Sequence, residues 1–273
     1  MGRRIVVAVA AATMLLLAAC SSNSSSSSPS TSSPPGATLT VLAAASLTNV
    51  FPKIGAEFTK QHPGTAFHFS FAGTDTLTAQ IEQGVPADVF AGASTKYGDQ
   101  LYGESLIEKP VPFATNTLVL IVPPDNPAKI TSPKDLTKPG IKLVVGAETV
   151  PVGSYTRTVL ANLNAQYGAG YDQKVLANVV SNEDAVTGVL QKVQLGEADA
   201  GFVYVTDAAG AGNAVKAIEL PQEAQATATY PIAAVKASKQ PTLAQQFVDF
   251  VLSPTAQQIL TQAKFGPAPS ASP

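Results

Sequence analysis

The chain has 273 residues, of which 45% are hydrophobic, so it is long and apolar enough to bury a sizeable core. Its formal net charge is −2, and it therefore lacks the basic excess that neutralises nucleic-acid phosphates. No nucleic-acid partner is therefore expected. The single cysteine excludes a disulfide within the chain.

The N-terminus has the features of a secretory signal. Arg3 and Arg4 precede a mostly apolar run that ends in small residues, which predicts a signal peptide over residues 1–19. The last four letters of "LLLAAC" resemble the lipobox of bacterial lipoproteins, in which the cysteine carries the lipid. We expect Cys20 to be the lipid attachment, holding the protein at the outer face of the cell membrane. The alternative is an ordinary signal peptide with an incidental cysteine.

Low-complexity segments flank the part of the chain that can fold. Residues 20–36, the lipidated cysteine and a Ser/Pro-rich stretch, are expected to form a disordered tether. Residues 266–273, "GPAPSASP", are expected to be a disordered tail. Without the two arginines of the signal peptide, 15 basic and 19 acidic residues remain.

Strand-like and helix-like segments alternate along the rest of the chain. The predicted strands are "LTVLAAA", "AFHFSFA", "ADVFAGA", "TLVLIV", "IKLVVG", "GFVYV" and "YPIAAVK". The predicted helices span residues 47–61, 75–83, 154–166, 184–195 and 242–263. Such alternation indicates an α/β protein with largely parallel sheets, and no solenoid-type repeat is present.

Four joints between a strand and a helix have similar chemistry. Ser46, Gly73-Thr74, Val152-Gly153 and Asp184 each precede or open a predicted helix. Ser46 and Asp184 are interpreted as helix caps. The small side chains of the alanines at 43–45 leave room for another group to approach the helix N-terminus at Ser46. Free N–H groups at several helix N-termini would bind an anion if the joints converged.

At these residues the chain resembles the molybdate-binding proteins of bacterial ABC importers, the ModA family. The resemblance spans residues 38–265 and is carried by "LTVLAAASLTNVF", "FSFAGTDTLTAQIEQGVPADVFAGAS", "VGAETVPVGSYT", "EDAVTGVLQKVQLGEADAGFVYVTDA", "YPIAAV" and "AQQFVDFVLSPTAQQIL". It implies the type II periplasmic-binding-protein fold, in which two α/β lobes joined by crossing strands hold an oxyanion in the cleft. Lobe one is expected over 38–115 plus 231–265, and lobe two over 116–230.

The resemblance also implies the ligands, position by position. Ser46 would donate from its hydroxyl and N–H, Thr74 from its hydroxyl, Val152 and Val186 from the main chain, and Tyr204 from its phenol. Thr74 replaces the usual serine and adds a methyl group. Two neighbouring polar residues are expected outside this set. Asp75 should point away or serve the first helical turn, and Ser94 lies where relatives often carry an aspartate.

The resemblance further implies molybdate or tungstate as the ligand, with no cofactor, no metal cation and no catalytic residue. The expected partners are a membrane permease and an ATPase, with the binding protein itself a monomer.

Three alternatives remain at this point. The first is the same fold with another oxyanion, such as sulfate or phosphate. The second is a secreted lipoprotein hydrolase, although neither His62 nor His68 lies in a recognisable catalytic or metal-binding motif. The third is a surface interaction lipoprotein without a small ligand, whose exposed aromatic stripe is not evident.

Overall fold

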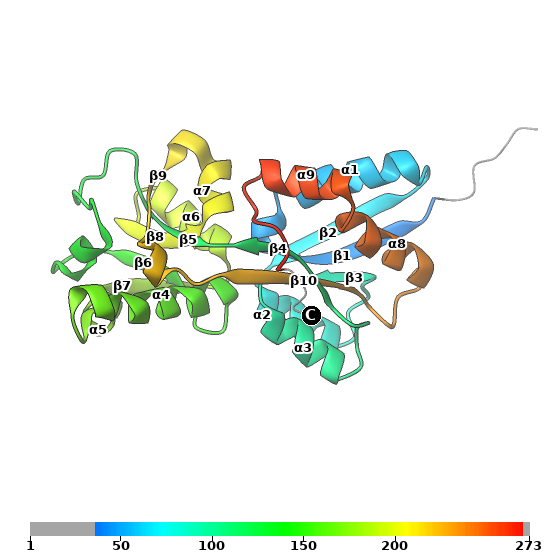
Figure 1. Cartoon of the computed structure of the whole chain (residues 1–273), viewed down its shortest axis with the longest axis horizontal. Helices are drawn as coiled ribbons and strands as arrows, with labels where there is room; N and C mark the ends of the chain where they lie inside the picture. Colours follow the sequence, from blue (N-terminus) through cyan, green and yellow to red (C-terminus); the bar gives the residue numbers. More distant parts are fainter. Residues whose placement is uncertain (1–35, 270–273) are drawn as a thin grey trace, which may run out of the picture. The chain divides into compact units, whose positions relative to one another are not determined.

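Two five-stranded sheets organise the protein, each forming the centre of one α/β lobe (Figure 1). The computed structural model describes residues 36–269. The first sheet has the strand order β2-β1-β3-β10-β4 and the second has the order β7-β6-β8-β5-β9. The predicted two-lobe α/β fold is therefore confirmed. The predicted signal peptide, Cys20 and most of the tether lie outside the described residues.

The first lobe contains β1 (Thr38–Ala44), β2 (Ala66–Ala72), β3 (Val89–Ala91), β4 (Val111–Asn116) and β10 (Ala228–Ala234), with α1 (Phe51–Gln61), α2 (Thr74–Glu82), α3 (Thr95–Gly103), α8 (Pro241–Val251) and α9 (Pro254–Gln262). The second contains β5 (Leu118–Val122), β6 (Leu143–Gly146), β7 (Val179–Glu183), β8 (Ala200–Tyr204) and β9 (Lys216–Ile218), with α4 (Pro151–Tyr167), α5 (Tyr171–Leu176), α6 (Val186–Gln194) and α7 (Val205–Ala211). Short 3₁₀ helices occupy Ala45–Leu47, Pro133–Thr137, Gly212–Ala214 and Gln222–Ala224.

Each sheet is mixed rather than largely parallel. Strand β1 runs parallel to β2 and β3, and β6 runs parallel to β7 and β8. Strands β10 and β5 are antiparallel to their neighbours. The expectation of largely parallel sheets was wrong because both of these strands lie next to a crossing between the lobes and enter their sheets in the reverse direction.

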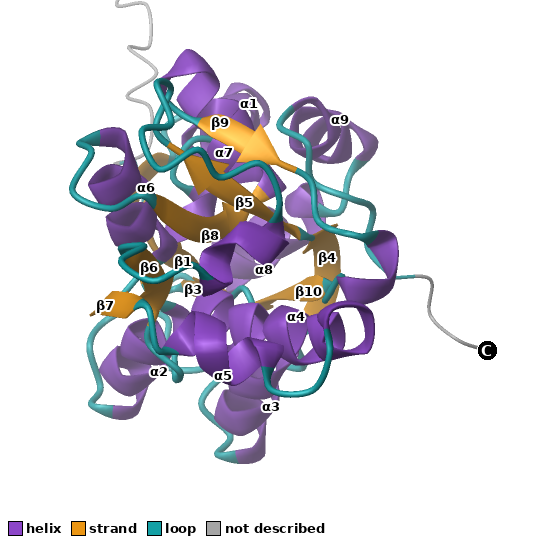
Figure 2. Ribbon diagram, turned by 90° about the vertical axis from the view of Figure 1, so that its left-hand side faces the viewer, coloured by secondary structure: helices purple, strands orange, loops and turns teal. Residues whose placement is uncertain are grey.

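Helices cover both faces of each sheet. In the second lobe, α4 and α5 lie on one face and α6 and α7 on the other (Figure 2). In the first lobe the alternation of side chains along β1 sends Leu42 towards the cluster beneath α2 and α3, while Val41 and Ala43 join the larger core on the opposite face. Both faces of these central strands are buried, which explains their nearly continuous apolar sequence.

The chain passes between the sheets twice. Strand β4 ends at Asn116 and β5 begins at Leu118, so the first crossing is a single residue long. On the return, Ala228 already pairs with Asn116 in the first sheet, three residues before the expected lobe boundary at 231. The two crossing segments therefore lie next to each other.

Several predicted helices have different limits in the structure. The expected helix over 242–263 is two helices, α8 and α9, because Ser253 and Pro254 start a new one and the Ser253 hydroxyl accepts a hydrogen bond from the Ala256 N–H at 3.4 Å. Elements α3, α5, α7, β4, β7 and β9 were not predicted, and most of these are short or expose much of their surface.

Order extends beyond the expected start of the C-terminal tail. Gly266 exchanges two backbone hydrogen bonds with Thr115, at 2.9 and 3.0 Å, and the carbonyl of Pro267 accepts from the Thr115 hydroxyl at 2.9 Å. Within residues 36–269 no helix is both long and apolar enough to cross a membrane.

Candidate oxyanion-binding site

The Ser46 hydroxyl lies at the end of β1, but it does not cap a helix. Residues Ala45–Leu47 form a 3₁₀ helix whose N-cap is Ala44, and α1 begins only at Phe51. The predicted helix over 47–61 therefore starts four residues too early, because Pro52 favours a helix start at this point. The Ser46 Oγ instead forms a 2.9 Å hydrogen bond with the Tyr230 hydroxyl.

Thr74 is the first residue of α2 and is almost fully buried. Its Oγ1 accepts a hydrogen bond from the Ala93 N–H at 3.1 Å, which leaves the hydroxyl proton of Thr74 available to a ligand. Ala93 therefore orients the Thr74 hydroxyl and also lines the pocket. Its neighbour Ser94 is not among the lining residues.

Asp75 contacts the opposite lobe. It lies in the first turn of α2, as expected, and its Oδ2 accepts a 3.0 Å hydrogen bond from the Thr149 hydroxyl. The hydroxyl of Tyr97 donates to the carbonyl of the same threonine. Asp75 Oδ1 is buried and has no hydrogen-bond partner among the described residues. These contacts join α2 and α3 of the first lobe to the segment just before α4 of the second.

Val152 and Val186 both occupy first turns of helices in the second lobe. Val152 follows Pro151 at the start of α4, and Val186 is the first residue of α6. Their N–H groups therefore have no acceptor within their own helix. The prediction that Asp184 caps this helix was wrong, because Ala185 holds the N-cap position without a side-chain bond.

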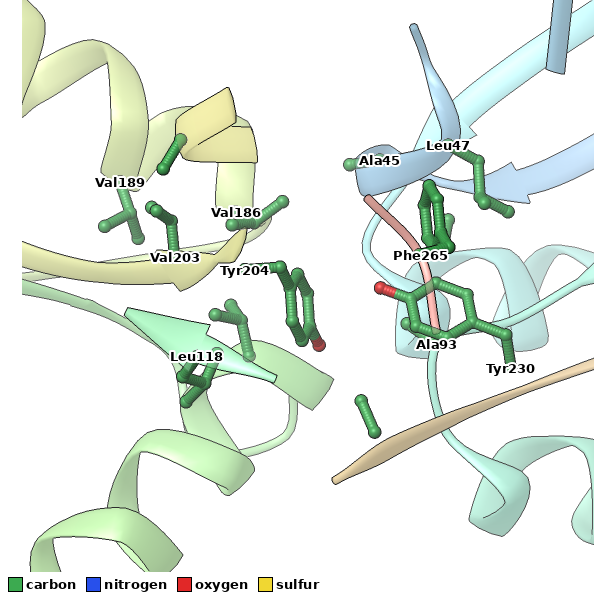
Figure 3. Packing of buried hydrophobic residues seen from close by; sticks show 14 of the residues in the cluster. Ala45, Leu47, Ala93, Leu118, Val186, Val189, Val203, Tyr204, Tyr230 and Phe265 are labelled. Atoms are coloured by element: carbon green, nitrogen blue, oxygen red, sulfur yellow. The ribbon is translucent and has the colours of Figure 1, made fainter. Parts of the chain in front are cut away.

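Tyr204 ends strand β8 with a buried phenol. Its hydroxyl has no hydrogen-bond partner among the described residues, although the side chain is only 2% exposed. Burial raises the pKa of Tyr204 well above its ordinary value, so the phenol stays neutral and can donate. Figure 3 shows the Tyr204 ring of the second lobe facing the Tyr230 ring of the first. The two rings are in edge contact, with centres 6.0 Å apart.

One small pocket brings together all five residues that the sequence singled out. Its empty space is at most about 210 Å³, including solvent at the mouth, so it has room only for a small ligand. Its lining residues are Ala44, Ala45, Ser46, Ala72, Gly73, Thr74, Ala93, Val150, Pro151, Val152, Ala185, Val186 and Tyr204. This lining contains no charged side chain, histidine or cysteine. The pocket therefore offers a small ligand hydroxyl and main-chain donors but no side-chain acid, base or cation.

The two lobes approach closely beside this pocket. A Cβ atom added to Gly73 would lie 2.3 Å from the carbonyl oxygen of Asp184, which belongs to the second lobe. Such a contact is far shorter than van der Waals packing allows, so this position requires a glycine while the lobes are this close.

Two buried polar residues behind the pocket were missed by the sequence analysis. Asn116 donates from Nδ2 to the Thr206 hydroxyl at 2.8 Å and to the Tyr230 hydroxyl at 3.5 Å. Tyr230 in turn contacts Ser46. These partners lie far apart along the chain, so no local pattern could have identified them.

Asp207, in the first turn of α7, is a further buried acid near the site. Its Oδ2 accepts from the Tyr204 N–H at 3.2 Å, and burial raises its pKa to about 7. None of the ion pairs within residues 36–269 includes this carboxyl group.

Comparisons with known proteins agree on one family. Residues 39–266 match the family profile described as bacterial extracellular solute-binding protein. The molybdate-binding protein ModA of Mycobacterium tuberculosis is 41% identical over 229 residues, 84% of each chain. The Escherichia coli ModA protein is 32% identical over 235 residues, covering 83% of this chain and 88% of its own.

Solved structures share the fold of this chain. The substrate-binding domain of a putative molybdenum ABC transporter from Clostridium difficile is 32% identical, has a TM-score of 0.64, and covers 86% of this chain and 100% of its own. The sulfate-binding protein SubI of Mycobacterium tuberculosis has a TM-score of 0.72 at 22% identity, covering 86% of this chain and 88% of its own. That second likeness shows the fold alone.

Proposed function

Because the chain belongs to the ModA family of bacterial extracellular solute-binding proteins, we propose that its pocket captures molybdate, and also tungstate, for an ABC importer. The observation that carries this proposal is the pocket shared by Ser46, Thr74, Val152, Val186 and Tyr204, which has donors from both lobes and no charged side chain. Its small volume suits a single tetrahedral ion.

Neutral donors are well suited to such an ion. Molybdate is a dianion whose four oxygens accept hydrogen bonds and carry no proton at neutral pH. A shell of hydroxyl and N–H donors satisfies those oxygens without the cost of burying counter-cations. The N-termini of α2, α4 and α6 add a fractional positive charge on the same side as the donors.

The division of donors between lobes supports a mechanism of closure. In the proposed arrangement the first lobe, built on the sheet β2-β1-β3-β10-β4, contributes Ser46 and Thr74. The second lobe, built on the sheet β7-β6-β8-β5-β9, contributes the other three donors. An anion that bridges the lobes stabilises the closed form, because only that form presents every donor to it. The closed form would then be recognised by a membrane permease whose transport is driven by an ATPase.

A lipid anchor would keep the protein at the outer face of the membrane, close to a permease. The proposed signal peptide and Cys20 supply that location through a lipid anchor, and residues 21–36 act as the tether. The binding protein is proposed to act as a monomer. Mass spectrometry of the membrane-extracted protein tests the anchor, because lipidation adds the mass of the acyl chains to a chain that begins at Cys20.

Calorimetric titration of the purified protein with molybdate, tungstate, sulfate and phosphate tests the ligand. The proposal predicts tight binding of one molybdate or tungstate ion per chain, with sulfate and phosphate much weaker. Binding of sulfate as tight as molybdate would contradict selection by size and favour a sulfate carrier with the same fold.

A further inference from the structure

A chain of buried hydrogen bonds leads from the lobe crossing to the pocket. Asn116, on β4, contacts Tyr230, on β10, and Tyr230 contacts Ser46 at the pocket wall. Both Asn116 and Tyr230 are almost completely buried, at 3% and 0% exposure. Their polar groups therefore depend on each other for hydrogen-bond partners.

The direction of the hydrogen bonds is fixed at the end of this chain that lies at the lobe crossing. The Thr117 N–H can only donate, and it contacts Asn116 Oδ1 at 3.0 Å. This contact fixes the orientation of the amide, so that Asn116 Nδ2 faces the hydroxyls of Thr206 and Tyr230 as a donor. Asn116 thereby occupies one lone pair of the Tyr230 oxygen, which favours the arrangement in which the Tyr230 hydroxyl donates to Ser46 Oγ, 2.9 Å away, although either hydroxyl can be the donor in that pair. In that arrangement the Ser46 proton points into the pocket.

We propose that Tyr230, oriented by Asn116, is a positioning residue that fixes the Ser46 hydroxyl as a donor and thereby restricts the pocket to oxyanions that carry no proton. The inference rests on the proposed function of the pocket. The Thr74 hydroxyl is also oriented as a donor to the ligand, because its oxygen accepts a hydrogen bond from the Ala93 N–H. The Tyr204 hydroxyl has no hydrogen-bond partner among the described residues, so its proton is also available to a ligand.

The consequence is selectivity by protonation state. Arsenate and phosphate are tetrahedral like molybdate, but each carries a proton at neutral pH that needs an acceptor. A pocket whose three hydroxyls all present protons leaves that ligand proton unpaired, and stranding such a group in a buried site weakens binding about tenfold or more. Consecutive donors in one direction also polarise each other, which strengthens the last hydrogen bond to a dianion.

A double-mutant cycle tests whether Tyr230 acts through Ser46. The variants are Tyr230→Phe, Ser46→Ala and the double variant, with molybdate affinity measured by calorimetry. Each single change is expected to weaken binding about 5- to 20-fold, and the double variant should be little worse than the weaker single one. Additive losses would overturn the inference, because they would mean that Tyr230 acts independently of the serine.

Arsenate competition supplies a readout that a purely structural role would not change. In Tyr230→Phe the Ser46 hydroxyl is free to turn and accept, so the preference for molybdate over arsenate should fall about fivefold or more. The matched control is Tyr171→Phe, which removes the hydroxyl of a buried tyrosine that donates to the Pro133 carbonyl at 2.6 Å, away from the pocket. It should leave both affinities unchanged.

An unchanged molybdate-to-arsenate ratio in Tyr230→Phe, with its thermal midpoint lowered as in Tyr171→Phe, would show a structural role only and overturn the inference. Failure of the wild-type protein to bind molybdate would instead refute the proposed function, and the inference with it.

Discussion

Replacing Tyr204 with phenylalanine should have opposite effects on the stability of the free protein and on ligand binding. With the lobes this close the Tyr204 hydroxyl is buried without a hydrogen-bond partner among the described residues, so a ligand-free protein that keeps this arrangement bears the cost of its lost hydration. Phenylalanine keeps the ring packing against Tyr230 and removes only the polar atom. The free variant is therefore expected to be more stable than the wild type, and the bound one less so.

The sizes of the two effects can be estimated separately. Removing an unsatisfied buried hydroxyl recovers about 1–3 kcal/mol, which for a domain of this size raises the thermal midpoint by roughly 2–4 °C per kcal/mol. Losing a hydrogen bond to a charged ligand costs about 1.5–3 kcal/mol, or about 10- to 150-fold in affinity. At a molybdate concentration about 1,000 times the wild-type Kd, the wild type gains about 4.1 kcal/mol, whereas a variant with 100-fold weaker binding gains only about 1.4 kcal/mol.

Thermal unfolding with and without molybdate, together with calorimetry, measures both effects. Molybdate should raise the midpoint of the wild type more than that of the variant, by about 2.7 kcal/mol of stability, so the order of the midpoints inverts wherever the recovered stability is smaller than this. Tyr171→Phe is the control, because its hydroxyl has a partner, and it should lower both midpoints by a similar amount and leave the affinity unchanged. A free Tyr204→Phe protein that is less stable than the wild type, or one that binds molybdate equally well, would refute the reasoning.

Four further predictions concern the pocket and the buried acid Asp207 near it. Gly73→Ala should hold the lobes apart, because its Cβ would meet the Asp184 carbonyl. Small-angle scattering should then show that molybdate no longer compacts the protein, and normal compaction would contradict this. Ser46→Ala and Thr74→Ala should each weaken molybdate binding by about 1–3 kcal/mol in calorimetry, and unchanged affinity in both would remove them from the site. Because burial raises the pKa of Asp207 to about 7, the folded protein binds more protons than the unfolded one between about pH 4 and 7, so stability should fall as pH rises through that range. Denaturant titrations should show this slope reduced in Asp207→Asn, and an identical slope would argue against a raised pKa. Finally, incubation with ester, peptide or phosphoester substrates should give no turnover above buffer, and any pocket-dependent turnover would contradict a binding role.

The resemblance to the ModA family predicted the five site residues, and the local pattern predicted the strand-to-helix joints at which most of them lie. Ser46, Thr74, Val152 and Val186 lie where a strand-like run changes to a helical period, and Tyr204 ends an apolar strand. The structure gathers all five around one pocket, while their binding of an oxyanion stays a prediction. Alternating apolar strands and helices likewise predicted an α/β protein, and the resemblance implied its two lobes.

What the sequence could not predict depends on contacts between distant residues. Tyr230 lies 184 positions from Ser46, and Asn116 lies 90 positions from Thr206, so their pairing exists only once the crossing strands are in place. The role given to Ser46 as a helix cap was wrong because Pro52 delays the helix. Helix α3 escaped prediction because its nine residues bury only Tyr97, Gly98 and Leu101, which is too weak an apolar stripe to recognise.

Anomalous diffraction at the molybdenum absorption edge, from crystals of the protein saturated with molybdate, tests the central claim most directly. The account predicts one strong molybdenum peak per chain in the pocket between the lobes, within hydrogen-bonding reach of Ser46, Thr74 and Tyr204 through the ion's oxygens. A peak elsewhere on the protein, or an empty pocket at saturating molybdate, would contradict it.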